Sequence, residues 1–193
     1  DDPSVRAVMI TGSRDCFTAG NDLEDFLNAS GNGEEMPVLR FLKTLTGLEI
    51  PMTAAVNGPA IGIGTTLLLH CDLVYAAPDA RFQMPFVKLG LCPEAGSSLL
   101  IPQLVGYRRV AELLMLGDAF GAEEARSMGI VNQVIASDNY QDYALQKTHQ
   151  LAELAPASIR ATKKLLRKAN ADLLQEVMDA EMANFNELLQ GAE

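Results

Sequence analysis

The chain contains 193 residues, of which 48% are hydrophobic and 21% are charged. This size and balance predict one globular domain and argue against a disordered or fibrous protein. The formal net charge of −10 argues against nucleic acid as the main partner, because phosphate contacts dominate such binding. No run reaches the roughly 18 apolar residues of a membrane span, and no signal-peptide pattern is visible, so we expect no membrane partner.

The cysteines and histidines predict no metal site. Cys16, Cys71 and Cys92 are widely spaced without a Cys-x-x-Cys pair, which is typical of reduced thiols in an intracellular protein. His70 and His149 have no metal-binding partner at the fourth residue beyond, and we expect His70 to satisfy a carbonyl group at a helix end. The location predicted from these features is cytoplasmic if the protein is bacterial, and otherwise intracellular, with the mitochondrion and peroxisome as alternatives.

Short apolar runs alternate with amphipathic segments along most of the chain. We expect strands at 5–11, 52–56, 73–77, 81–84 and 130–135, and helices at 38–48, 65–70, 99–105, 107–116 and 121–129. A short helix can also begin at Asn21, and 28–37 is a polar stretch. Alternation of this kind predicts an α/β core with parallel strands. Helices follow at 145–154 and 158–189, with a break near Asn170. We therefore divide the chain into a core over 1–136 and a C-terminal helical region over 137–193.

Two turns rich in small residues follow predicted buried strands. One contains Phe17-Thr18-Ala19-Gly20, and the other runs from Asn57-Gly58 to Gly62-Ile63-Gly64. Small side chains let a ligand approach the backbone, and free N–H groups there can bind an anion. If the two turns converge, they would form an oxyanion hole. Spacing alone leaves a second interpretation open, in which both are merely tight strand-to-helix turns.

Glu94 is the candidate acid–base residue. It lies between Pro93 and Ala95 and follows the apolar Leu91 and Cys92. A carboxyl group in apolar surroundings has a raised pKa and can act as a general base near neutral pH. The residues by themselves also allow a solvent-facing glutamate at a helix start, since Pro-Glu begins many helices.

Together these segments resemble the crotonase family, also called the enoyl-CoA hydratase/isomerase family. The resemblance runs from about residue 5 to about 134 and includes Ala55-Val56-Asn57-Gly58, the Gly62-x-Gly64 pair, Cys71-Asp72 and Leu89-Gly90. It implies an α/β spiral of ββα units with a C-terminal helical trimerisation region, and a homotrimer or dimer of trimers. In the family, a strand hairpin and a helix precede the segment that matches 2–5, so we expect the N-terminal portion to be absent.

The resemblance also implies the roles of individual residues. The N–H groups of Ala19 and Ile63 would polarise the thioester carbonyl of an acyl-CoA, which is the expected partner. Coenzyme A would enter only as part of that substrate, with no other cofactor. The implied contacts with substrate or CoA are Thr18, Gly20, Asn21, Asp22, Leu23, Gly62, Gly64, Thr66, Phe86 and Leu91. Candidates for its phosphates are Arg14, Lys88, Arg160, Lys163, Lys164, Arg167 and Lys168, although those at 160–168 could equally form a solvated helix face.

Departures from the family pattern favour one reaction. Family hydratases use two glutamates, and this chain has Thr66 and Phe86 at those positions, where we expect apolar surroundings that exclude water. The remaining Glu94 looks like the single base of Δ3,Δ2-enoyl-CoA isomerases of fatty-acid β-oxidation, which moves a proton from C2 to C4. We therefore expect an isomerase with weak or absent hydratase activity. The alternatives are another crotonase-type reaction on an unidentified acyl-CoA, and a catalytically silent acyl-CoA-binding paralogue.

Overall fold

The structure, a computed structural model, describes residues 2, 4–13, 15–21 and 37–191. Four parallel strands form one sheet in the order β1 (Val8–Thr11), β2 (Met52–Val56), β4 (Leu73–Ala76) and β7 (Gln133–Val134). A second sheet joins β3 (Pro59–Ile61), β5 (Arg81–Gln83) and β6 (Phe120–Gly121), with β3 and β5 parallel and β6 antiparallel. Both sheets confirm an α/β core built largely on parallel pairing.

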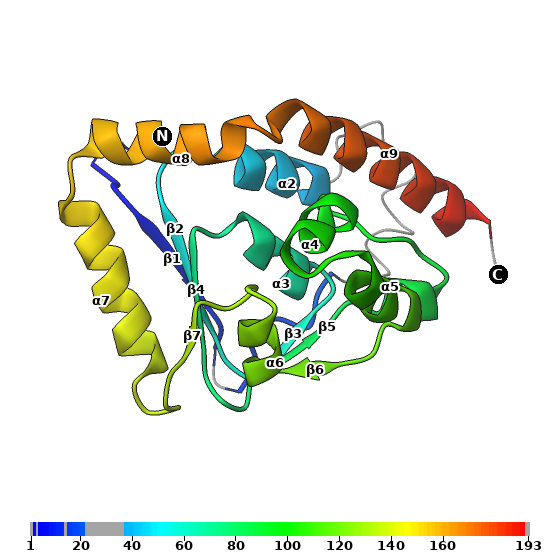
Figure 1. Cartoon of the computed structure of the whole chain (residues 1–193), viewed down its shortest axis with the longest axis horizontal. Helices are drawn as coiled ribbons and strands as arrows, with labels where there is room; N and C mark the ends of the chain where they lie inside the picture. The colour runs from blue at the N-terminus through cyan, green and yellow to red at the C-terminus, as the bar shows by residue number, and fades with distance from the viewer. Residues whose placement is uncertain (1, 3, 14, 22–36, 192–193) are drawn as a thin grey trace.

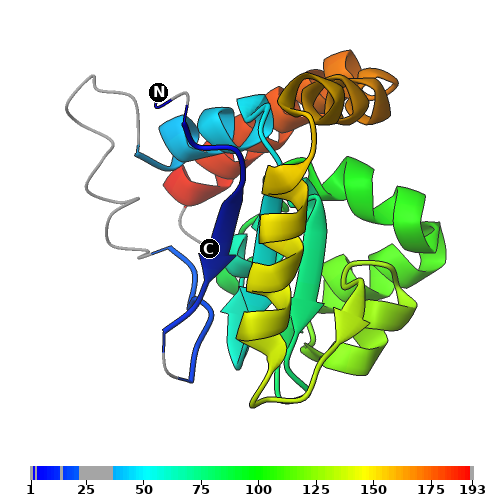
Figure 2. The same cartoon turned by 90° about the vertical axis from the view of Figure 1, so that its left-hand side faces the viewer.

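The helices cover the sheets and extend along one side of the molecule (Figure 1). They are α2 (Pro37–Gly47), α3 (Ile63–Thr66), α4 (Ser97–Val105), α5 (Tyr107–Leu116), α6 (Ala122–Ser127), α7 (Tyr140–Glu153), α8 (Pro156–Lys168) and α9 (Ala171–Gln190), with 3-10 helices η1 (Leu67–His70) and η2 (Phe86–Leu89). Figure 1 shows α8 and α9 as a continuous band beside α2 and α4. Figure 2 shows α7 running along the strands of the parallel sheet.

Most predicted elements are present with shifted ends. The strand expected at 5–11 begins only at Val8, because the N–H of Val5 donates to the carbonyl of Asp2 in a turn. The strand expected at 130–135 shrinks to two residues, since the N–H groups of Ile130 and Val131 donate to a carbonyl of α6 instead. The break near Asn170 is confirmed.

Two observed strands were absent from the prediction, and two predicted segments lie mostly outside the described residues. β3 and β6 were not expected, because runs of three and two residues are too short to show a period of two. The short helix expected from Asn21 and most of the polar stretch at 28–37 lie outside the described residues.

The parallel sheet is covered on both of its faces. Every residue of β2 is buried, as is typical of a central parallel strand. On one face, α7 packs where Tyr75, Ala55 and Ala144 form a small cluster, and the Tyr75 and Tyr143 rings meet edge to face at 5.1 Å. The other face joins the main core, which extends to the second sheet and to α9.

Inward-pointing basic side chains anchor α8 to this core. The Nζ of Lys163 donates to a carboxylate oxygen of Asp72 and to the carbonyl of Ile50, both at 2.7 Å. The same Asp72 oxygen accepts the N–H of Met52 at 2.8 Å. The guanidinium of Arg167 donates to the carbonyl of His70 at 2.7 Å. These bonds fix the end of α8 and therefore the start of α9.

We expect Lys163→Met to lower the free energy of unfolding by about 2–3 kcal/mol, because the partly buried Asp72 carboxylate loses the cation that hydrogen-bonds it and keeps only the more distant Arg167, at 3.9 Å. Urea unfolding of the variant measures this change. The control is Lys164→Met on the exposed neighbouring position, which should unfold like the wild type. Equal midpoints for the two variants would contradict the anchoring role.

Candidate active site

The turn at 17–20 lies directly against β3 and the start of α3. Thr18 pairs with Ala60 in a parallel bridge, donating its N–H to the carbonyl of Pro59 at 3.1 Å and accepting the N–H of Ile61 at 3.0 Å. A Cβ at Gly64 would lie 2.5 Å from the methyl carbon of Thr18, so glycine is required for this approach. The two glycine-containing turns therefore converge, as the oxyanion-hole interpretation requires.

Several N–H groups of these turns already have an acceptor. The N–H of Gly20 donates to the hydroxyl of Thr18 at 3.2 Å, and that of Gly62 donates to a carbonyl of β5 at 2.9 Å. Within the described part of the chain, the N–H groups of Ala19 and Ile63 have no protein acceptor, and both residues line one pocket. This pair is therefore available for a ligand oxygen, which is what an oxyanion hole needs.

That pocket has a volume of about 160 Å³. Its walls are formed by Ala19, Gly20, Asn21, Ile61, Gly62, Ile63, Pro85, Phe86, Leu89, Leu91, Glu94 and Phe185. Of the other residues proposed from the sequence, Thr18, Gly64 and Thr66 are not among these lining residues, whereas Asp22 and Leu23 lie outside the described residues. The pocket thus gathers Glu94 and the two free N–H groups from three separate segments.

The Glu94 carboxyl is 4% exposed and is the one titratable group among the described residues that line the pocket. Burial raises the pKa of Glu94 to about 7, with a smaller contribution from the negative charge of Glu181. The hydroxyl of Thr66 donates to Oε1 of Glu94 at 3.0 Å and opposes this rise by stabilising the charged form. The expectation that Thr66 provides an apolar wall was wrong on this point, because its hydroxyl faces the carboxyl.

Glu94 lies at the start of a turn in an unusual backbone conformation. Ala95 and Gly96 both have left-handed dihedrals, with φ of 58° and 71°. The hydroxyl of Ser97 donates to the Glu94 carbonyl at 2.6 Å. On the other side, Nε2 of His70 lies 2.7 Å from the carbonyl oxygen of Ala95, which confirms the carbonyl-binding role expected for this histidine. The turn aims Glu94 into the pocket at the cost of local strain.

Glu181 is a residue of this region that sequence reasoning missed. It lies on α9, is 8% exposed, and accepts hydrogen bonds from the N–H of Gly96 at 2.6 Å and of Ser98 at 3.0 Å. The hydroxyl of Ser98 donates to the same carboxylate at 2.5 Å. The sequence does contain one signal: Glu181 lies four residues before Phe185, on the apolar face of a long helix where a charged residue needs partners.

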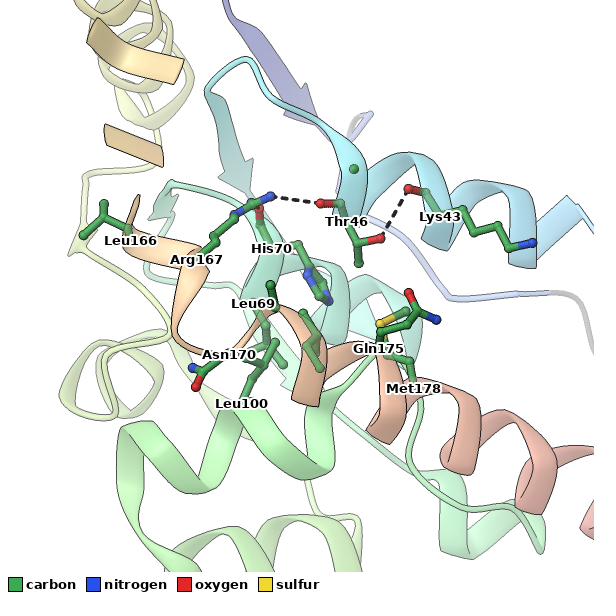
Figure 3. Close-up of a pocket in the computed structure, with 13 residues that line it drawn as sticks. Lys43, Thr46, Leu69, His70, Leu100, Leu166, Arg167, Asn170, Gln175 and Met178 are labelled. Atoms are coloured by element: carbon green, nitrogen blue, oxygen red, sulfur yellow. Dashed lines mark hydrogen bonds between the residues drawn. The ribbon is translucent and has the colours of Figure 1, made fainter. Parts of the chain in front are cut away.

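The basic residues proposed for CoA phosphates are only partly available. Lys163 is buried and needs its oxygen partners, so its assignment was wrong. Arg167 is partly exposed, but its guanidinium already donates to the carbonyls of His70 and Thr46 and is therefore a structural anchor. Figure 3 shows Arg167 reaching back toward Thr46 at the edge of a separate pocket of about 490 Å³ between α2, α4 and α9. Lys88 pairs with the exposed Asp118 at 2.6 Å, and Arg14 lies outside the described residues.

Within the described residues, no group of histidine, cysteine and acidic residues is arranged to hold a metal ion, and no helix has the length and apolar character to cross a membrane. Cys16, Cys71 and Cys92 are free thiols.

Comparisons with known proteins agree with this geometry. A family model described as "Enoyl-CoA hydratase/isomerase" matches residues 1–193. The chain belongs to this family.

Relatives within the family have different reactions in their names. Enoyl-CoA delta isomerase 2 of Rattus norvegicus is 38% identical over 179 residues, which cover 90% of this chain and 46% of the rat protein. The 2,3-dehydroadipyl-CoA hydratase of Escherichia coli is 33% identical, over 95% of this chain and 72% of the hydratase. The crystal structure of an enoyl-CoA hydratase/isomerase from Pseudoalteromonas atlantica is 45% identical with a TM-score of 0.93, over 97% and 74% of the two chains. The chain thus spans about half the length of the rat isomerase and more of the other two.

A stability measurement tests the protonation of Glu94. Its pKa is near 7 in the folded protein and ordinary, near 4.5, when unfolded, so the folded state binds more protons between these values. Wild type should therefore lose stability relative to Glu94→Gln as the pH rises from 4.5 to 7, by about 3 kcal/mol in all. Urea unfolding at several pH values measures this difference.

The exposed Glu176→Gln on α9 is the matched control and should show no comparable pH-dependent difference. If Glu94→Gln parallels wild type between pH 5 and 8, the buried carboxyl does not have a raised pKa.

Proposed function

We propose that the protein is an acyl-CoA isomerase that converts a 3-enoyl-CoA into the conjugated 2-enoyl-CoA. The observation that carries this proposal is the composition of the pocket: one buried carboxyl, Glu94, lies in the same walls as the two free N–H groups of Ala19 and Ile63. One general base and one oxyanion hole are the minimum set of groups needed to move a proton between carbons near a thioester.

In the proposed reaction, Glu94 acts first as a base and then as an acid, and the two N–H groups stabilise the intermediate between these steps. The Glu94 carboxylate removes a proton from C2, and the electron pair moves onto the thioester oxygen to give a dienolate. The N–H groups of Ala19 and Ile63 stabilise the negative charge on that oxygen. The protonated Glu94 then returns its proton to C4, while the double bond forms between C2 and C3. The pKa of about 7 lets Glu94 act as base and as acid near neutral pH.

The pocket supports isomerisation over hydration. Water addition in family hydratases uses two glutamates, whereas this chain presents Phe86, which is 6% exposed and lines the pocket, and Thr66, whose hydroxyl is engaged by Glu94. With no second carboxyl among the described lining residues, there is no separate group to activate a water. The mixture of isomerases and hydratases among the relatives makes hydration the second candidate.

Substituting Glu94 tests the isomerase proposal directly. Glu94→Gln should lower the rate of conjugated thioester formation from a 3-enoyl-CoA by about 10²–10⁴-fold, because the proposed base is lost while the shape of the pocket is retained. Absorbance of the conjugated product follows the reaction, and Glu176→Gln is the control. Hydration of crotonyl-CoA faster than isomerisation would favour the second candidate, and equal isomerisation rates for wild type and Glu94→Gln would refute the role of Glu94.

The pH dependence gives a further test. Because Glu94 must be deprotonated to remove the C2 proton, kcat/KM for isomerisation should fall as the pH drops below about 7. Steady-state rates between pH 5 and 9 measure this limb. A limb near pH 4.5 would mean that the free enzyme does not bury Glu94 as described.

Assembly and pathway stay predictions. Leu165 and Leu166 on α8 are 69% and 80% exposed, and an exposed apolar pair is consistent with the proposed homotrimer or dimer of trimers. A role in β-oxidation agrees with the isomerase reaction and is proposed with it.

A further inference from the structure

We propose that Glu181 is a positioning residue for Glu94: from α9, its carboxylate bridges Gly96 and Ser98 and holds the turn that aims Glu94 into the pocket. This inference deepens the proposed function, because it matters for catalysis only if Glu94 is the base. It assigns to the C-terminal helix a part in the proton-transfer step.

The turn needs an external partner because its own backbone is strained. Ala95 has φ of 58°, a left-handed conformation that is strained for a residue with a Cβ. Gly96 follows at φ of 71°, and a Cβ there would lie 2.3 Å from Cδ1 of Leu174 on α9. Helix α9 is therefore packed directly onto the turn, and its side chains are the ones placed to hold it.

Glu181 supplies the matching acceptors. One carboxylate oxygen accepts the N–H of Gly96 at 2.6 Å, and the other accepts both the N–H and the hydroxyl of Ser98, at 3.0 and 2.5 Å. These N–H groups lie at the N-terminal end of α4, one on the capping residue Gly96 and one in the first turn, where a negative charge is favoured by the helix dipole. All three donors lie two to four residues after Glu94, so the bridge fixes the backbone that carries the Glu94 side chain.

The charged and titratable groups around this turn are few. Burial lowers the pKa of His70, which holds the Ala95 carbonyl from η1, so this imidazole is neutral near pH 7. Burial also raises the pKa of the Cys92 thiol, whose sulfur lies 3.5 Å from the Glu181 carbonyl, so this thiol stays protonated. The charge of Glu181 raises the pKa of Glu94. Glu181 thus acts on Glu94 through both the position of the turn and its charge.

The same helix also completes the pocket. Phe185 follows Glu181 by one helical turn, is 4% exposed, and forms part of the pocket wall that includes Glu94. The packing of α9 through Glu181 therefore places the Phe185 ring and the Glu94 carboxyl in the walls of the same pocket.

Three substitutions separate position from charge. In Glu181→Gln one of the two acceptor oxygens becomes an NH2 group that cannot accept an N–H, so half of the bridge and the whole charge are lost. Glu181→Asp keeps the charge but is too short to reach both Gly96 and Ser98. Ser98→Ala removes one donor and keeps the rest. Glu176→Gln, exposed on the same helix, is the matched control for the loss of one charge.

Steady-state kinetics with a 3-enoyl-CoA give the first readout. We expect Glu181→Gln to lower kcat by about 10²-fold with KM little changed, since displacing a base by about 1 Å costs that much. Glu181→Asp should lower kcat less, and Ser98→Ala and Glu176→Gln only slightly. If Glu181→Gln does not fold, the comparison of Glu181→Asp with Glu176→Gln decides: equal kcat values overturn the proposal.

A carbon-13 NMR titration of glutamate-labelled protein gives a readout that needs no turnover. The Glu94 carboxyl signal, assigned by its loss in Glu94→Gln, should titrate at lower pH in Glu181→Gln and close to wild type in Glu181→Asp and Glu176→Gln. An unchanged Glu94 titration in Glu181→Gln, together with an unchanged kcat, overturns the inference. A wild type without isomerase activity refutes the proposed function, while the titration still decides the effect of Glu181 on Glu94.

Discussion

The burial of one carboxyl group, that of Glu94, is the constraint on which the site depends. Removing an ionisable group from water costs free energy unless partners compensate or its pKa shifts. Here the compensation is small, one hydroxyl from Thr66, so the shift is large and gives the carboxyl a pKa of about 7. A base of this kind can give back the proton that it takes. Its placement must then be held by the backbone, because few side-chain contacts reach the carboxyl itself.

The holding contacts come from distant parts of the chain. His70 binds the carbonyl that follows Glu94, and Glu181 binds the N–H groups beyond it. Glu181 in turn depends on α8, which Lys163 ties to Asp72 beside the parallel sheet. A continuous set of hydrogen bonds and packing contacts thus connects the interior strands to the candidate base. Weakening the anchor of α8 would be expected to loosen the site as well as the fold.

The proposed mechanism uses main-chain groups for one task and a side chain for the other. In the proposed mechanism, the N–H groups of Ala19 and Ile63 act through the main chain, so their side chains matter only for the shape of the turns. The base acts through its side chain and cannot be replaced in kind. The resemblance implies that the chain keeps the family's oxyanion turns, while Thr66 and Phe86 occupy positions where family hydratases have carboxylates. In the proposed mechanism, the number of carboxyl groups in the pocket, more than the fold, limits which reaction can occur.

The sequence by itself determined the α/β class, most strands and helices and the break near Asn170, and it made Glu94 and the two glycine-containing turns the candidates for a site. These are local properties, since periodicity and small residues after apolar runs can be seen within short windows. The tertiary structure alone decided which N–H groups stay free, that Lys163 and Arg167 are anchors, and that Glu181 supports the turn after Glu94. Gly96 and Glu181 lie 85 residues apart, and only the packing of α9 onto the core brings them into contact. No pattern within one segment encodes such a pair, because its energy arises when both have been buried.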